Sequence, residues 1–430
     1  MNETATGAAT GATPGTAPGR PVSEAVHRHA LTFICITILI DTIGFGIIIP
    51  SLPNLVMSVG QVDLADATRI GGLLLVAYAG LQFICGPLFG NLSDRFGRRP
   101  VLLLSLLAFS VDYLLMGFAP NLMWLFVGRA IAGIAGAVYA PAGAYIADIS
   151  TPEKRAGSFG MMGAMFGLGF IIGPGIGGLI AQFGDRAPFF AASAIAMLNM
   201  VYGYFVLPES LPRSQRRPFS LARANPFGTF TALAKYPAVL GLALAMFLWQ
   251  LGHQVYPSTW SFFAKARFDW SPTAIGLSLA FTGVTMVLVQ FFVTKPAVKA
   301  FGENRAAMIG VASGTLGFVI NAFATEGWVV YVAMTVGALQ GLTYASMQGL
   351  MSRQIPANAQ GELQGGVASL SSLSSIIGPY VMSQALARYA DVHAPVYFPG
   401  AAFALAGGLG IACLVVLATQ LRPHAASTTV

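Results

Sequence analysis

Long runs of apolar residues alternate with short polar connectors along almost the whole chain. A helix that crosses a hydrocarbon core about 30 Å thick needs roughly 20 predominantly apolar residues. Gly and Pro interrupt several runs, which membrane helices tolerate. The pattern predicts twelve transmembrane helices, at residues 30–52, 69–89, 100–119, 122–147, 157–182, 187–207, 237–261, 273–294, 304–324, 327–350, 362–387 and 394–419. The expected fold class is an all-α membrane protein.

One connector is much longer than the others and follows the sixth predicted helix. The predicted parts are a disordered N-terminal tail at 1–29, an N-terminal six-helix half at 30–207, a cytoplasmic linker at 208–236, a C-terminal six-helix half at 237–420 and a C-terminal tail at 421–430. The N-terminal tail is a Thr/Ala/Gly/Pro mixture, and such a composition cannot bury a core.

The two predicted halves repeat short motifs at one fixed offset. Phe96-Gly97 recurs as Phe301-Gly302, and Ile171-Ile172-Gly173-Pro174 recurs as Ile376-Ile377-Gly378-Pro379, each time 205 residues later. A shared offset in corresponding helices indicates an internal duplication. Transporters built from such repeats bind their substrate near the midplane, at the interface between the repeats.

Composition and charge support a membrane protein and give its orientation. Hydrophobic residues make up 55% of the chain and charged residues only 9%, against about 25% charged in soluble domains. If both termini are cytoplasmic, the inner segments hold 17 of the 23 Lys and Arg residues. Basic residues favour the cytoplasmic side, so this orientation is predicted, in a cell (inner) membrane. The basic residues lie in short connectors rather than on an exposed domain, so no nucleic-acid partner is expected.

Several function classes find no support in the polar segments. The three cysteines, Cys35, Cys85 and Cys413, all lie inside apolar runs, where buried packing is the expected role. No metal-ligand cluster, nucleophile–base arrangement or phosphate loop lies outside the membrane, so the chain is not expected to be an enzyme. A receptor or scaffold without transport would lack any extramembrane domain for signalling.

Three ionisable residues lie inside apolar runs. They are Asp41, Asp112 and Arg129. Ionisable residues at membrane depth are costly, so each is a functional candidate by default. Either carboxylate could carry the transported proton, or it could serve only as the permanent partner of Arg129 or as a helix cap. The second half has no such carboxylate, so a proton carrier is expected in the first half.

A charged loop motif joins the second and third predicted helices. Its main positions are Gly90, Asp94, Arg95, Gly97, Arg98 and Arg99. An acidic residue among arginines, between helices that move, predicts a conformational latch that opens and closes. The alternative is a positive-inside anchor without further role. Asp148 and Arg155, at the end of the fourth helix, indicate a second latch or ordinary helix-end interactions.

The fifth predicted helix has an unusual density of small residues. The pattern consists of Gly160, Gly169, Gly173, Pro174, Gly177 and Gly178. Glycines at this spacing remove side chains from one helix face and permit close helix contact. Pro174 is expected to bend the helix.

Polar and aromatic residues at helical spacing predict a substrate surface. They are Tyr78, Gln82, Gln250, His253, Gln254, Gln290, Gln340, Tyr344 and Gln364. Neutral hydrogen-bonding groups among Phe and Met suit bulky amphipathic ligands. Each amide could equally make a hydrogen bond between helices.

These motifs resemble those of the major facilitator superfamily. The loop from Gly90 to Arg99 is similar to its loop signature, Arg129 to its fourth-helix motif for proton transfer, and the fifth helix to its antiporter motif. From about residue 30 to 420 the chain is similar to the tetracycline efflux family. That resemblance implies a monomeric antiporter that exports tetracycline-like or other amphipathic drugs. It implies that Asp41 and Asp112 take part in exchange with protons.

The same resemblance implies no resident cofactor. The proton gradient supplies the energy, and a divalent metal could arrive bound to the substrate. Met286 and Gly314 stand where those pumps carry a His and an Asp tied to transport, and Asn54 replaces an acidic residue. The substrate is therefore left open among tetracycline, another drug and a small metabolite. The runner-up is a proton-coupled importer of a small nutrient, against which the fifth helix argues.

Overall fold

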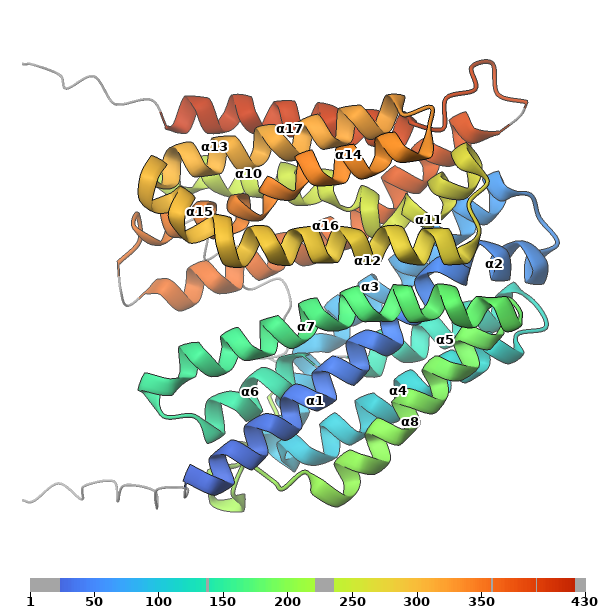
Figure 1. Cartoon of the computed structure of the whole chain (residues 1–430). Coiled ribbons are helices and arrows are strands. Elements are labelled where there is room, and N and C mark those ends of the chain that lie inside the picture. Colours follow the sequence, from blue (N-terminus) through green and yellow to red (C-terminus); the bar gives the residue numbers. More distant parts are fainter. Residues whose placement is uncertain (1–23, 137–138, 221–235, 357–358, 392, 422–430) are drawn as a thin grey trace, which may run out of the picture.

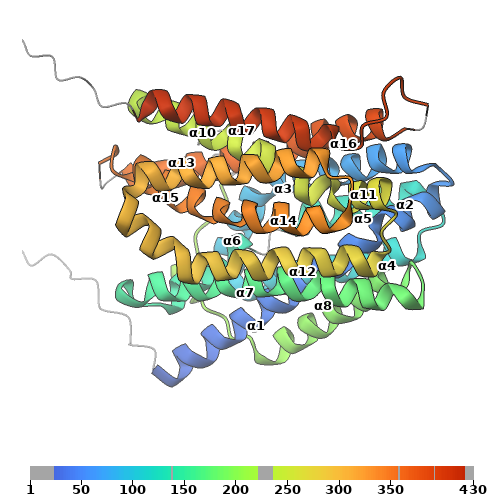
Figure 2. The same ribbon diagram turned by 45° about the horizontal axis from the view of Figure 1, so that its top comes forward.

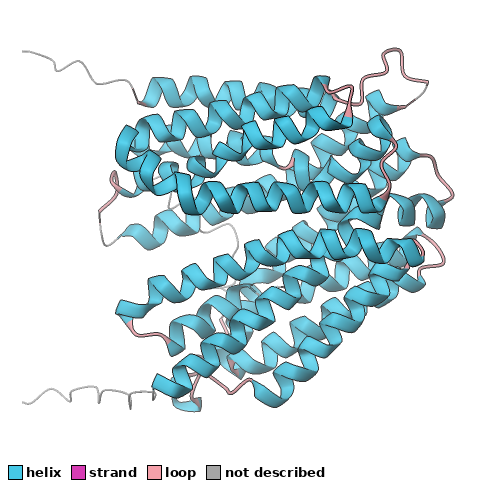
Figure 3. Cartoon of the chain, in the orientation of Figure 1, coloured by secondary structure: helices cyan, strands magenta, loops and turns pink. Residues whose placement is uncertain are grey.

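The computed structural model describes residues 24–136, 139–220, 236–356, 359–391 and 393–421. These residues form helices and connecting loops, and they contain no β-strand (Figure 3). The predicted tails up to residue 23 and from residue 422 lie outside the described residues. Figure 1 shows two bundles of helices, one formed by α1 to α8 and the other by α10 to α17. The predicted all-α fold class is confirmed.

The first bundle holds the N-terminal half of the chain. Its helices are α1 (Glu24–Ile48), η1 (Ile49–Ser51), α2 (Leu52–Gly60), α3 (Leu64–Phe96), α4 (Arg98–Phe118), α5 (Leu122–Ala135), α6 (Tyr139–Ile149), α7 (Pro152–Ile180), η2 (Ala181–Phe183) and α8 (Ala187–Val206). A short turn, η3 (Arg213–Gln215), follows in the linker. Since α1 begins at Glu24, it starts six residues before the first predicted span.

The second bundle holds the C-terminal half. Its helices are α10 (Pro237–His253), α11 (Val255–Phe268), α12 (Pro272–Leu288), the π-helical segment η5 (Val289–Val293), α13 (Thr294–Phe323), α14 (Gly327–Gly337), η6 (Ala338–Gln340), α15 (Gly341–Ser352), α16 (Gln360–Ala390) and α17 (Ala401–Gln420). The break between α10 and α11 lies near Pro257, whose ring conflicts with the carbonyl four residues earlier.

Twelve membrane crossings fit these helices. Nine described segments are long and apolar enough to cross a membrane, and one of them, Pro272–Phe323, has 52 residues and covers two predicted spans. The shorter apolar helix α5 and helix α6 both lie in the fourth predicted span, and α16 supplies the remaining crossing. The protein is therefore a multi-pass membrane protein.

Glycine ends the helices at the charged loop and at its repeat. Most of the predicted loop is helical, because α3 continues through Arg95 and stops only at Gly97. Gly97 has a φ of +108° and Gly302 has a φ of +75°. L-residues with a side chain rarely adopt such angles. The duplicated Phe-Gly pair thus marks the same backbone turn in both halves.

The two halves contact each other mainly at one end of the molecule. We call the end where α1 begins and α17 finishes the tail end, and the opposite end the distal end. The seams are α7 with α12 and α3 with α16. Near the distal end the Ser261 hydroxyl donates to the Ile49 carbonyl at 3.0 Å, and the Thr273 hydroxyl donates to the Gly178 carbonyl at 2.8 Å. Toward the tail end α7 and α12 diverge (Figure 1), and Figure 2 shows both bundles with the top of Figure 1 turned forward.

Candidate functional site

A buried ion pair lies at the centre of the first half. Arg129 on α5 binds Asp112 on α4 through both Nε and Nη2, and the Nε–Oδ1 distance is 3.2 Å. Asp112 is 0% exposed and Arg129 is 3% exposed. A Cβ on Gly128 would stand 2.7 Å from Asp112 Oδ1. Gly128 therefore makes room for the carboxylate, which the sequence alone did not indicate.

Two tyrosine rings flank the guanidinium of Arg129. Its Cζ lies 5.7 Å from the ring centre of Tyr78 and 5.8 Å from that of Tyr113. A cation within about 6 Å of a ring centre is attracted by the π-face. The predicted Arg129 and Tyr78 are thus brought together, while Tyr113 is a neighbour that the sequence analysis did not select.

Asp41 lies beside this cluster without a partner of its own. It is 7% exposed, and it makes no hydrogen bond or ion pair with a described residue. Its charge acts electrostatically on the phenols of Tyr78 and Tyr113, so it belongs to the same site. Of the two carboxylates, the structure gives Arg129 to Asp112 and leaves Asp41 unpaired.

A cavity between the halves borders this cluster. Its volume is only about 50 Å³, and Arg129 is the charged residue in its lining. The other lining residues are Phe45, Ile48, Ile49, Leu52, Leu74, Leu75 and Met116 from the first half and Pro257, Ser258, Ser261 and Phe262 from α11. The wall is therefore largely apolar, and the second half contributes the helix that follows its break at Gln254.

The nine residues predicted to form a substrate surface lie apart from that lining. In the first half, Gln82 donates to the Tyr78 hydroxyl at 3.1 Å and to the Gly136 carbonyl at 3.3 Å. In the second half, Gln254 donates to the Ser375 hydroxyl at 2.9 Å. These amides make contacts between or within helices, and their role toward a substrate stays a prediction.

The remaining members of that surface lie in the second half. Tyr344 and Gln364 meet at Gln348, at 3.1 Å and 3.4 Å. His253 packs between the rings of Trp249 and Tyr256. Gln250 Nε2 and Gln340 Oε1 are buried and have no hydrogen-bond partner among the described residues. The side chain of Gln290 is exposed.

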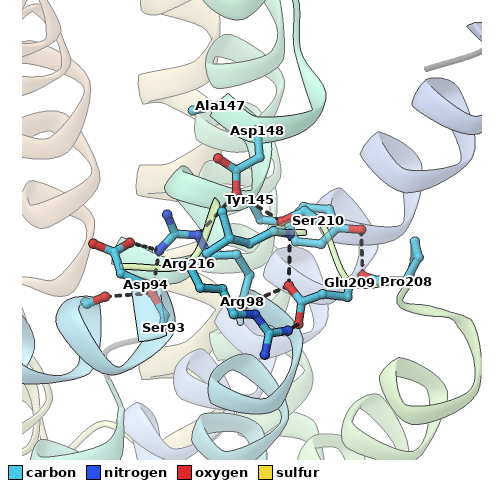
Figure 4. Close-up of polar contacts among 12 residues, drawn as sticks. Ser93, Asp94, Arg98, Tyr145, Ala147, Asp148, Pro208, Glu209, Ser210 and Arg216 are labelled. Carbon is cyan, nitrogen blue, oxygen red and sulfur yellow. Dashed lines mark hydrogen bonds and ion pairs between the residues drawn. The ribbon is translucent and has the colours of Figure 1, made fainter. Parts of the chain in front are cut away.

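The charged loop forms a compact network around Arg98 (Figure 4). The Arg98 guanidinium lies 2.6 Å from Asp94, 3.2 Å from Asp148 and 2.6 Å from the Ser93 hydroxyl. The Arg98 backbone N–H donates to Glu209 at 2.8 Å. The structure thus brings together both predicted latches, at the ends of α3, α4 and α6.

The linker joins this network. Glu209 also lies 3.7 Å from Arg216, and the Arg217 N–H donates to the Asp94 carbonyl at 3.1 Å. A Cβ on Gly97 would lie 2.7 Å from the Glu209 carboxyl carbon. The sequence analysis did not place Glu209 in the latch, because its partner Arg98 lies 111 residues earlier in the chain.

Three other arginines predicted for the latches point elsewhere. Arg95 stacks over the Phe96 ring at 5.1 Å, and Arg99 donates to the Tyr204 carbonyl at 2.5 Å. The Arg155 guanidinium donates to the Ala147 carbonyl at 3.2 Å. A Cβ built on the predicted Gly90 would meet no neighbouring atom within 4 Å, so this position is not a close helix contact.

The small residues of α7 divide between two partners. A Cβ on Gly169 would lie 2.7 Å from Thr42 Cβ, and a Cβ on Gly173 would lie 2.8 Å from Gly46 Cα, so these glycines receive α1. Gly177 also faces α1, at Ile47. Gly178 and the Pro174 carbonyl contact α12, whereas a Cβ on Gly160 would meet no neighbouring atom within 4 Å.

Gly314 and Asn54, which differ from the residues of the tetracycline efflux family, make ordinary structural contacts. A Cβ on Gly314 would lie 3.0 Å from Gln340 Cβ and 3.2 Å from Trp249 Cζ2, so the indole fills the space of the missing side chain. Asn54 donates to Asp185 at 2.8 Å. Among the described residues, no three His, Cys, Asp or Glu side chains gather as a metal site requires.

Comparison with known proteins agrees with this architecture. The model of the Major Facilitator Superfamily matches residues 34–379 and 268–429. The chain is 42% identical over 400 residues to the tetracycline resistance protein, class C, of Escherichia coli, covering 93% of this chain and 99% of that protein. It is 35% identical to the class B protein of Escherichia coli, covering 80% and 85%. It is 29% identical to multidrug resistance protein 2 of Bacillus subtilis, covering 91% and 96%.

Solved structures show the same fold. The nucleoside transporter NupG matches with a TM-score of 0.73 at 12% identity, covering 91% of this chain and 99% of that chain. The human organic anion transporter MFSD10 matches with a TM-score of 0.66 at 23% identity, covering 91% and 99%.

Proposed function

The chain belongs to the major facilitator superfamily and, within it, to the tetracycline resistance proteins, and we propose that it is a proton-coupled antiporter that exports tetracycline-like amphipathic compounds. The tail end faces the cytoplasm, since most basic residues lie there. The membrane is the bacterial inner membrane, as the bacterial relatives suggest.

The observation that carries the proposal is the unpaired carboxylate of Asp41 beside a neutral ion pair. Asp112 and Arg129 cancel each other's charge, so neither needs a further ligand. An isolated carboxylate out of water is unfavourable unless it is protonated or meets a cation. Asp41 therefore exchanges a proton for a positively charged or strongly hydrogen-bonding group of the substrate.

This exchange couples the two directions of transport. The substrate enters the cavity from the tail end or the adjoining leaflet and displaces the proton from Asp41. The halves then rock about the cavity and expose it at the distal end. Protonation from outside releases the substrate and resets the carrier. The proton gradient supplies the energy, and a divalent metal enters only as part of a substrate complex.

A single chain is sufficient for this cycle. The cavity is lined by α1, η1, α2, α3, α4 and α5 of one half and by α11 of the other, and both halves belong to the same chain. The protein is therefore proposed to act as a monomer, without a resident cofactor.

Neutralising Asp41 tests the proposal. Inverted membrane vesicles with a proton gradient should accumulate tetracycline. Asp41→Asn should lower that uptake at least about tenfold, which corresponds to a barrier change of about 1.4 kcal/mol. The matched control is Asp66→Asn, because Asp66 is exposed and pairs only locally with Arg69 at 2.5 Å. Uptake by Asp41→Asn equal to the control would remove Asp41 from the mechanism.

A further inference from the structure

The seam between α7 and α12 is tightly packed only near the distal end. A Cβ on Gly175 would lie 3.7 Å from Ala280 Cβ, and a Cβ on Gly178 would lie 2.6 Å from the Pro272 carbonyl oxygen. Ile171 packs on Gly283 in the same seam. The two helices run antiparallel here, so earlier residues of α7 face later residues of α12.

Beyond Ile171 the same face of α7 has no side chains larger than methyl. Steps of three and four residues toward the tail end lead to Gly167, Ala164, Gly160 and Gly157. Such steps keep to one helix face. A Cβ on any of the three glycines would have open space within 4 Å. This face of α7, which we call the bare stripe, is a continuation of an established interface that is left unpacked.

The opposite helix changes from small to large residues at the same level. On α12 the face toward α7 runs through Gly276, Ala280 and Gly283 and then continues through Val287 to Phe291. Phe291 lies in the π-helical segment η5, which has more residues per turn than an α-helix. This wider turn keeps Phe291, four residues after Val287, on the face toward α7. The Phe291 side chain is 68% exposed.

The register places the two features opposite each other. Gly175 faces Ala280 and Ile171 faces Gly283, so a step of four residues back along α7 corresponds to a step of three residues forward along α12. Extending this antiparallel pairing puts Phe291 near Gly160 and Ala164. An aromatic ring would then face the one part of α7 that offers room for it.

We propose that Phe291 of the π-helical segment packs into the bare stripe of α7 at Gly160 and Ala164 when the tail end closes, and so forms the tail-end gate. The inference rests on the proposed transport cycle, in which that end must close in every turn. Small residues let helices approach closely in a membrane, where packing drives helix association. An inserted aromatic ring also seals the seam against water.

Disulfide trapping tests this directly in the full-length protein in proteoliposomes. Cys85→Ser first removes the partly exposed native thiol, since Cys35 and Cys413 are buried. The test pair is Gly160→Cys with Phe291→Cys, and the positive control is Gly175→Cys with Ala280→Cys. The control Cβ atoms are 3.7 Å apart, within the usual disulfide range of about 3.5–4.5 Å.

The test pair is expected to cross-link under oxidant and to block transport until it is reduced. The disulfide traps the closed state, so the product accumulates even without substrate. No cross-link of the test pair while the control pair reacts to completion would overturn the gate. That result would leave the proposed function standing if tetracycline is still exported. A pair that cross-links but exports no tetracycline after reduction, together with a wild-type chain that exports none, would support the gate and contradict the proposed function.

Exchanging size across the seam gives a second, independent test. Gly160→Leu should abolish transport by holding the gate open, and adding Phe291→Ala should restore a large part of it. The matched control is Gly408→Leu on α17, where a Cβ also meets open space; α17 packs on helices of its own half. Normal transport by Gly160→Leu, or no rescue by Phe291→Ala, would contradict the proposal.

Discussion

The two halves of the molecule share one backbone plan but place opposite charges on it at the tail end. Arg98 pairs with Asp148 at 3.2 Å in the first half, and Glu303 pairs with Arg353 at 2.8 Å in the second. Both residues of the second pair stand 205 positions after their counterparts, with the charges reversed. The duplication has therefore kept the pairing of two helix ends, while the sign of each partner has changed.

Inside the membrane, the first half carries charged residues at positions where the second half carries uncharged ones. The positions 205 residues after Asp112 and Arg129 are Gly317 and Met334. Met334 is only 3% exposed, so it packs in the core where the first half carries its cation. The first half thus holds buried charges at these positions, and the second half has neutral residues there. In the proposed transport cycle, two halves of similar backbone therefore have different roles.

Breaking the charge cluster of the first half should have the largest effect. Arg129→Gln leaves Asp112 buried without its counterion, and breaking a buried pair costs about 3–5 kcal/mol. The thermal unfolding temperature in detergent should fall strongly. The double variant Asp112→Asn with Arg129→Gln should regain most of that stability but no transport. Met334→Gln in the second half is the comparison, and a loss as large as that of Arg129→Gln would contradict the assigned difference.

Substituting the glycine of the duplicated turn should destabilise the protein less than breaking the buried ion pair, and the two halves should differ in the size of the loss. Gly97→Ala and Gly302→Ala both force a side chain into a positive φ, which costs of order 1–3 kcal/mol. Gly97→Ala should cost more, because its Cβ would also press on the Glu209 carboxyl, whereas a Cβ on Gly302 meets open space. Thermal unfolding of the two variants measures the difference. Equal losses of thermal stability would show that Glu209 moves away from an added Cβ on Gly97 at no cost.

Reversing the ion pairs should have the smallest effect on stability. Arg353 is 71% exposed, so its pair with Glu303 contributes about 0.2–1 kcal/mol at most. The exchange Glu303→Arg with Arg353→Glu should therefore preserve both stability and transport. The exchange Arg98→Asp with Asp148→Arg should not, because Arg98 also binds Asp94 and Ser93. If both exchanges are tolerated, the first pair has no more partners than the second.

The sequence predicted the depth of the charged residues well, because a charge inside an apolar run is visible without a structure. It could not decide which carboxylate would take Arg129, since that choice depends on how α1, α4 and α5 pack. The gap that Gly128 leaves for Asp112 became visible only with both helices in place.

Long-range partners were the main omission. The sequence analysis did not select Glu209, yet this residue accepts a hydrogen bond from the Arg98 backbone N–H across the fold. The π-helical segment at Val289–Val293 was also missed, because its residues fit an apolar helix of any pitch. The cavity lining from α11 was not predicted, since periodicity does not show which face of a broken helix meets the other half.

The most direct measurement is proton release by the purified protein when tetracycline binds at a constant pH without a gradient. The account predicts that the wild-type chain releases a proton into a weakly buffered solution as the drug binds, and that Asp41→Asn binds without release. Release by Asp41→Asn equal to that of the wild type would contradict the central claim that Asp41 exchanges its proton for the substrate.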